Sequence, residues 1–100
     1  MEVVLTPALL AYMQQKNRQA VVLEVATANT SDVEITELFC RLARARDIPY
    51  LVEKKQFRTV AAPGGTALLP NYRLHYDDVV TFDVRKTLWF HSLTVTGVRI

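Results

Sequence analysis

The sequence contains a single cysteine, Cys40, among one hundred residues, so no disulfide bond can form within the chain. A lone free thiol is typical of a reducing compartment, and we expect a cytoplasmic protein. The N-terminus has no basic stretch before its apolar residues and no cleavage-site pattern, so we do not expect a signal peptide. No apolar run approaches the length that spans a bilayer, and a membrane is not an expected partner.

Charge is also sparse. Only 22% of the residues are charged and the net charge is +2. No dense run of Lys or Arg is present, so nucleic acid is not an expected partner. Arg41, Arg44 and Arg46 form a local concentration interrupted by apolar residues. We interpret it as a solvated face, with a patch for phosphate or a partner as the alternative.

Half of the residues are hydrophobic, which is enough for a real core. No repeat, low-complexity tract or linker divides the chain. We therefore expect one domain over residues 1–100 that folds without a disulfide or a structural metal.

Local signals define the first elements. Residues 2–5 predict a short strand, and Thr6 followed by Pro7 predicts a helix with Thr6 as its N-cap, ending near Asn17. Residues 20–28 predict a mostly buried strand. The polar residues 29–32 predict an exposed turn, because short polar side chains close turns by bonding to nearby backbone. We expect this turn to bind no metal, because its oxygen ligands suit magnesium or calcium rather than iron, and one carboxylate is too little charge for a tight calcium site.

Residues 33–46 fit two structures. Ile35, Leu38, Phe39 and Leu42 have helical spacing, and Ser31 with Glu34 could form a capping box. A strand would instead place Leu38, Cys40 and Leu42 on one face.

Later segments are read with the same rules. Residues 50–62 predict a hairpin that turns near Lys54 and Lys55, although the usual Asn-Gly turn is absent. We expect a loop at 63–66, an irregular link at 67–78, and strands at 79–84 and 92–98.

The segment 87–93, TLWFHSL, holds the only tryptophan. Leu88, Trp89 and Phe90 are three large apolar residues in a row, which indicates a buried turn or short helix. We expect Trp89 to be largely buried and His91 to lie at the edge of this segment.

Few residues could carry chemistry. The candidate metal ligands are Cys40, His75 and His91, with Asp77 and Asp78 beside His75, and their spacing matches no zinc motif. Apolar neighbours should bury the Cys40 thiol, raise its pKa and leave it poorly reactive. We see no activated nucleophile or acid–base pair, so we expect no catalytic residue and no enzyme.

The chain nevertheless resembles a known family. VVTFDVRKTLWFHSLTVTGVRI at the C-terminus, VVLTPALLAYMQQKN at the N-terminus, AVVLEVATA and YLVEKKQFRTVAA are similar to segments of small HesB-like proteins, relatives of the A-type iron–sulfur carriers. The resemblance implies an α+β, β-rich pseudo-barrel of two small mixed sheets with one short N-terminal helix. It also implies an extended chain at 33–46, and we therefore predict a strand from Leu38 to Arg44.

The family's chemistry depends on cysteines that follow the second strand and lie near the C-terminus. Residues 28–32 and the last sixty residues of this chain contain none, and Cys40 lies about ten residues beyond the ligand position. The resemblance therefore implies the scaffold without mapping a ligand onto it. Our first hypothesis is a HesB-like scaffold or interaction protein without a cofactor, with a homodimer or another protein as partner. The alternative is an iron or iron–sulfur carrier that uses Cys40 with His75 or His91, and no pathway is indicated.

Overall fold

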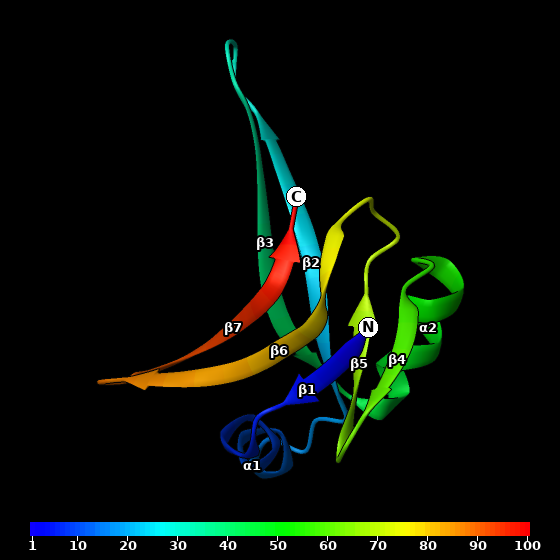
Figure 1. The fold of residues 1–100 in the computed structure, drawn as a ribbon, viewed down its shortest axis with the longest axis vertical. Coiled ribbons are helices and arrows are strands. Elements are labelled where there is room, and N and C mark those ends of the chain that lie inside the picture. Colours follow the sequence, from blue (N-terminus) through cyan, green and yellow to red (C-terminus); the bar gives the residue numbers. More distant parts are fainter.

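The computed structural model describes all residues, 1–100, and contains two mixed sheets and two short helices (Figure 1). The elements, in chain order, are β1 (Glu2–Leu5), α1 (Pro7–Gln15), β2 (Ala20–Asn29), β3 (Glu34–Ala43), the 3₁₀ turn η1 (Ala45–Asp47), α2 (Ile48–Lys54), β4 (Arg58–Ala62), β5 (Gly65–Leu69), β6 (His75–Thr87) and β7 (Phe90–Arg99).

The two sheets pack against each other. One has the strand order β1-β6-β7 and the other β3-β2-β5-β4, and each contains one parallel pair, β1 with β6 and β2 with β5. Both sheets supply the main core, formed by Val3, Leu5, Leu9, Met13, Val21, Leu23, Ala67, Leu69, Val80 and Phe82. The predicted β-rich α+β class with two small mixed sheets is confirmed, although the sheets do not close into a barrel.

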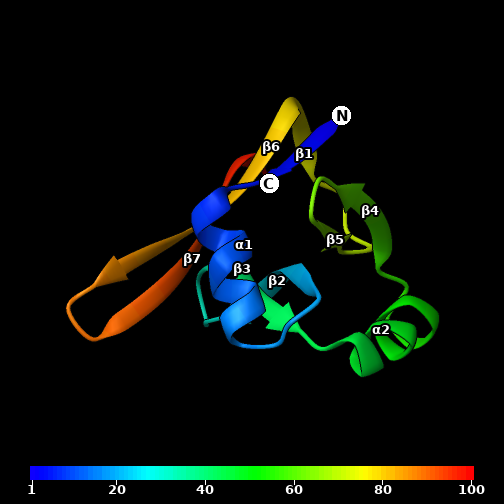
Figure 2. The ribbon, with the colours of Figure 1, turned by 90° about the horizontal axis from the view of Figure 1, so that it is seen from below.

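Helix α1 begins as the sequence predicts. The hydroxyl of Thr6 accepts a hydrogen bond from the backbone N–H of Leu9 at 3.2 Å, and Pro7 occupies the first turn. Leu9 and Met13, one turn apart, enter the main core. The helix ends at Gln15, and Asn17 reverses the chain with a φ of +54°. In the view from below, α1 lies across the end of the space between the sheets (Figure 2).

The strand prediction for the ambiguous segment is confirmed. β3 pairs with β2 along its whole length in an antiparallel register, from Ala20 opposite Ala43 to Asn29 opposite Glu34. The partly buried side chains of Leu38, Cys40 and Leu42 face the main core, as the strand interpretation required. Ten backbone pairs with β2 outweigh the local helical pattern, because strand pairing depends on a partner strand that the periodicity of one segment does not show.

The predicted hairpin at 50–62 is wrong. Ile48–Lys54 is a second helix, α2, with a proline in its first turn, and only the final part of the segment is strand, in β4. Leu51 of α2 fills a small second core with Ala20, Val22, Ala43 and Leu68, on the opposite side of the larger sheet from the main core. Covering that apolar face makes a helix more favourable than a hairpin here.

The real hairpin in this region joins β4 to β5. Pro63 followed by Gly64, with a φ of +83°, is the order typical of a type II turn, so the predicted loop is a tight turn. The predicted irregular link is wrong at its start, because Ala67, Leu68 and Leu69 belong to β5 and pair with β4. It is wrong again at its end, because β6 begins at His75.

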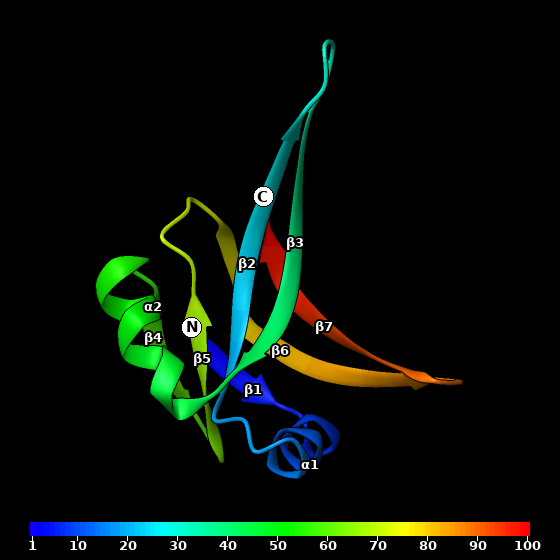
Figure 3. The same ribbon diagram turned by 180° about the vertical axis from the view of Figure 1, so that it is seen from behind.

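The prediction that Trp89 is buried is wrong. Leu88 and Trp89 are the two loop residues of the β6–β7 hairpin, whose last pair joins Thr87 to Phe90. Leu88, Trp89 and Phe90 are 86%, 88% and 68% exposed. The β6–β7 hairpin extends well beyond α1 and the four-stranded sheet (Figures 1 and 3), so nothing in the chain covers its tip.

Candidate functional site

Cys40 lies on β3 opposite Leu23, with its side chain half-buried against the main core. Burial removes water from the sulfur and raises the pKa of the Cys40 thiol to about 11. At neutral pH the residue is therefore a neutral thiol, and the thiolate that attacks electrophiles or binds iron is scarce. The predicted direction of the pKa shift is confirmed, while the reactivity stays a prediction.

The two histidines lie at opposite ends of the β6–β7 ladder. His75 is paired with Arg99, and His91 is paired with Lys86, eleven residues further along β6. At about 3.3 Å per residue, this places the two levels roughly 35 Å apart along the strand. His75 and His91 therefore do not serve one site within a single chain.

Each histidine also has an unfavourable setting for a metal cation. His91 stacks on Tyr12 of α1, with ring centroids 4.4 Å apart and planes 19° from parallel. Its cross-strand neighbour is a lysine, and the neighbour of His75 is an arginine. Positive neighbours disfavour the approach of a cation.

The acidic residues near His75 do not complete a metal site. Asp77 accepts a hydrogen bond from the guanidinium of Arg99 at 2.7 Å, so that carboxylate is already paired. No group of three or more His, Cys, Asp or Glu side chains is positioned to hold a metal ion. The structure does not bring Cys40, His75 and His91 together, and these donors do not fit a cluster that is held by several thiolates.

The stretch where the resemblance to HesB-like proteins would place cysteines is the tip of the β2–β3 hairpin, the upper point in Figure 1. Residues 29–32 are exposed, and the predicted turn is confirmed for residues 30–32, while Asn29 is the last residue of β2. The Thr30 hydroxyl accepts a hydrogen bond from the Val33 N–H at 3.1 Å and donates one to the Val33 carbonyl at 3.0 Å. The side chain closes the turn, which is the conformational role expected from the sequence.

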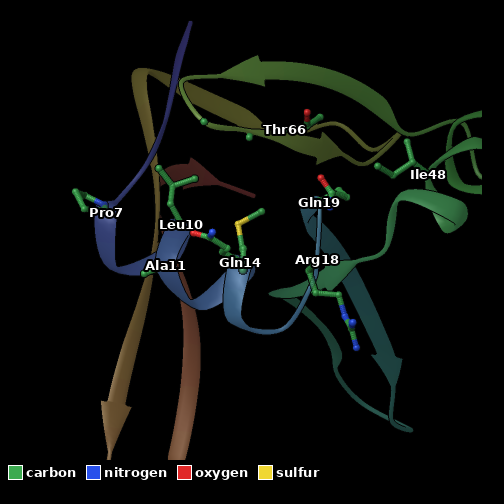
Figure 4. A pocket seen from close by; sticks show the side chains of 11 residues that line it. Pro7, Leu10, Ala11, Gln14, Arg18, Gln19, Ile48 and Thr66 are labelled. Atoms are coloured by element: carbon green, nitrogen blue, oxygen red, sulfur yellow. The ribbon is translucent and has the colours of Figure 1, made fainter.

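A groove of about 850 Å³ lies between α1 and the turn that joins β4 to β5 (Figure 4). Leu10 and Met13 supply part of its apolar wall, and Gln14, Gln19 and Thr66 supply amide and hydroxyl groups. The lining contains no histidine, cysteine or carboxylate, so the groove presents no acid–base pair.

The sequence interpretation missed the surface that the β6–β7 hairpin makes. We define the hairpin tip as Leu88, Trp89 and Phe90, which follow Thr87, the last residue of β6. An exposed tryptophan beside two other large apolar side chains is rare on a monomer surface and is typical of a contact site. The only available signal was position: two adjacent residues between two strands with matching patterns indicate a hairpin loop.

The likeness to proteins of known structure concerns the fold. The crystal structure of Escherichia coli SufA, described as involved in biosynthesis of iron–sulfur clusters, aligns with 96% of this chain and 80% of that chain, with a TM-score of 0.54. The chain has a SufA-like fold. Only 13% of the aligned residues are identical, so the likeness confirms the family resemblance at the level of the fold alone. No protein-family model matches the sequence, and no curated protein does. Neither α1 nor α2 has the length and hydrophobicity of a membrane-spanning helix.

Proposed function

We propose that this protein is a non-catalytic interaction protein with a SufA-like fold that acts beside iron–sulfur cluster assembly without holding a cluster. The observation that carries the proposal is the state of its one thiol. Cys40 is half-buried, its pKa is raised to about 11, and no His, Cys, Asp or Glu side chains gather around it as a ligand set. We place its work in the reducing cytoplasm, where a lone thiol stays free.

The hairpin tip supports a role in contacts with another protein. Tryptophan is enriched among the residues that dominate binding energy at interfaces, because it buries a large area with few rotatable bonds. Trp89 is 88% exposed at the end of a projecting hairpin, so another molecule can cover it without rearrangement of the fold. The partner is a second copy of this chain or a different protein.

The alternative function is an iron or iron–sulfur carrier that uses unusual ligands, and the fold shared with SufA favours it. Such a carrier would need Cys40 thiolates from more than one copy, with His75 or His91 as further ligands. Forming each thiolate would require a large fall in the pKa of Cys40 when iron binds.

Anaerobic reconstitution with iron and sulfide separates the two functions. We expect wild type and Cys40→Ala to hold equally little iron after desalting, with no absorbance band at about 400 nm from thiolate-to-iron charge transfer. A double variant, Asn29→Cys with Thr30→Cys, should hold more iron than either, because it places two exposed thiols at the tip of the β2–β3 hairpin.

Wild type that holds iron in proportion to protein, and loses it in Cys40→Ala, would establish the carrier instead. Iron held in proportion to protein by both wild type and Cys40→Ala would mean that other residues bind it, and the proposal would fail. The contact role is measured separately, by sedimentation of wild type and Trp89→Ala over a range of concentrations. A larger mass for wild type alone identifies a second copy as the partner of the hairpin tip.

A further inference from the structure

A second hollow, of about 370 Å³, lies where the connection from α1 to β2 meets the connection from β3 to η1. Its six lining residues are Asn17, Arg18, Gln19, Arg44, Ala45 and Arg46. Of the three arginines, Arg18 belongs to the first connection, Arg44 to the second and Arg46 to η1 itself. The sequence interpretation noted Arg44 and Arg46 but not Arg18, which is far from them in the chain.

Backbone bonds bring the two connections together. The N–H of Gln19 donates to the carbonyl of Ala43 at 2.9 Å, so the residues beside that bond, Arg18 and Arg44, are held at the same edge. The N–H of Arg18 also donates to the carbonyl of Met13 at 2.8 Å, which fixes its backbone against the end of α1. Figure 4 shows the Arg18 side chain directed away from the groove beside Leu10 and Thr66.

These arginines have no acidic partner. The only ion pairs of the chain join Arg41 to Glu24 and Arg99 to Asp77, so Arg18, Arg44 and Arg46 have no carboxylate oxygen within 4.0 Å. The hollow itself is lined by no Asp or Glu. One nitrogen of Arg18 donates to the carbonyl of Lys16 at 2.7 Å, which leaves its other donors free. Like charges held together repel each other, and an anion between them would relieve that repulsion.

We propose that this arginine hollow binds a compact anion with at least two negative groups, of the diphosphate class. The planar guanidinium donates pairs of hydrogen bonds that match phosphate oxygens, and the side-chain amides of Asn17 and Gln19 offer further donors. Ala45 is the only hydrophobic residue of the lining and no aromatic side chain belongs to it, so the lining suits a charged group better than an apolar one. Its volume also lies near the lower limit for small-molecule sites, about 300 Å³. This anion site does not depend on the interaction function proposed above.

Calorimetric titration with inorganic pyrophosphate tests the site at constant ionic strength. We expect saturable binding to wild type, about tenfold weaker binding to each of Arg18→Gln, Arg44→Gln and Arg46→Gln, and none to the triple variant, because each loses a charged hydrogen bond. The matched control is Arg41→Gln, which removes a nearby arginine that is already paired with Glu24, and its affinity should equal that of wild type. The single variants decide the question if the triple variant does not fold.

Citrate, titrated beside pyrophosphate, distinguishes carboxylate from phosphate chemistry. Binding of citrate as tight as that of pyrophosphate would overturn the diphosphate class. Absence of saturable pyrophosphate binding to wild type would overturn the site itself. The same conclusion would follow if Arg41→Gln weakened binding as much as the other single variants, since the effect would then come from net charge.

Discussion

Because Trp89 is exposed and Phe82 is buried, replacing each by alanine should change the free energy of unfolding by very different amounts. Trp89 is 88% exposed and Phe82 is fully buried in the main core. About one eighth of the tryptophan surface is covered, which is about 30 Å² of the roughly 250 Å² that the largest aromatic side chains bury. At about 25 cal/mol per Å², Trp89→Ala should cost less than about 1 kcal/mol. Phe82→Ala should cost about 3–5 kcal/mol, because it leaves a cavity in a packed core.

Urea denaturation followed by far-ultraviolet circular dichroism measures both costs without relying on the tryptophan. Fluorescence of the native protein, at a concentration low enough to keep it monomeric, gives an independent check. The emission maximum of Trp89 should change little on unfolding, and acrylamide should quench native and unfolded protein to a similar degree. A Trp89→Ala protein that loses about 3 kcal/mol, the cost of a buried ring, would show that the tip packs onto the fold.

Three further outcomes follow from single residues. The raised pKa of Cys40, about 11 against 9.0 for a free thiol, predicts alkylation roughly 100-fold slower than in urea-unfolded protein at neutral pH, and equal rates in both states would contradict it. Gly97→Ala should lower the urea midpoint clearly, because φ is +89° and a Cβ would meet the Val79 carbonyl oxygen. Hydrogen bonds from the Thr6 hydroxyl and the Val84 N–H lower the pKa of Asp83 below 3.8. Asp83 therefore adds stability above that pH that is lost as the pH falls through its folded pKa, and urea midpoints of Asp83→Asn should fall less steeply in acid than those of wild type.

Elements with local signals were predictable from sequence. Thr6 and Pro7 define the start of α1 because a cap and an N-terminal proline act within one turn of the chain. The alternation in β2 is also local, with Val21 and Leu23 in the main core and Ala20 and Val22 in the second core. Such patterns identify an element without knowledge of its partner.

Elements whose structure depends on contacts with another segment were not predictable in this way. Residues 33–46 have helical spacing, and only the resemblance to HesB-like proteins favoured the strand that pairs with β2. The local pattern of residues 50–62 predicted a hairpin, where the chain forms α2 because Leu51 covers the second core. The spacing of apolar residues does not decide between a helix and a strand here, since a short apolar run fits both.

The prediction that the hairpin tip is buried was wrong for a different reason. Three large apolar residues in a row usually lie in a core, so composition predicts burial for Leu88, Trp89 and Phe90. Their exposure follows from the length of β6 and β7, which carries the loop past the packed part of the molecule. Leu88 even adopts a φ of +46°, a conformation that is uncommon for a leucine, where a glycine or asparagine would be usual.

The candidate sites and the fold depend on different residues. The two cores consist of buried apolar side chains from strands and helices, and none of their members belongs to the hairpin tip or the arginine hollow. Substitutions at the hairpin tip or in the arginine hollow should therefore cost little stability, because they remove little buried apolar area. This separation explains how a chain with one half-buried thiol can share the fold of SufA at 13% identity. The fold of this chain depends on the apolar side chains between its two sheets, and neither the hairpin tip nor the arginine hollow supplies any of them.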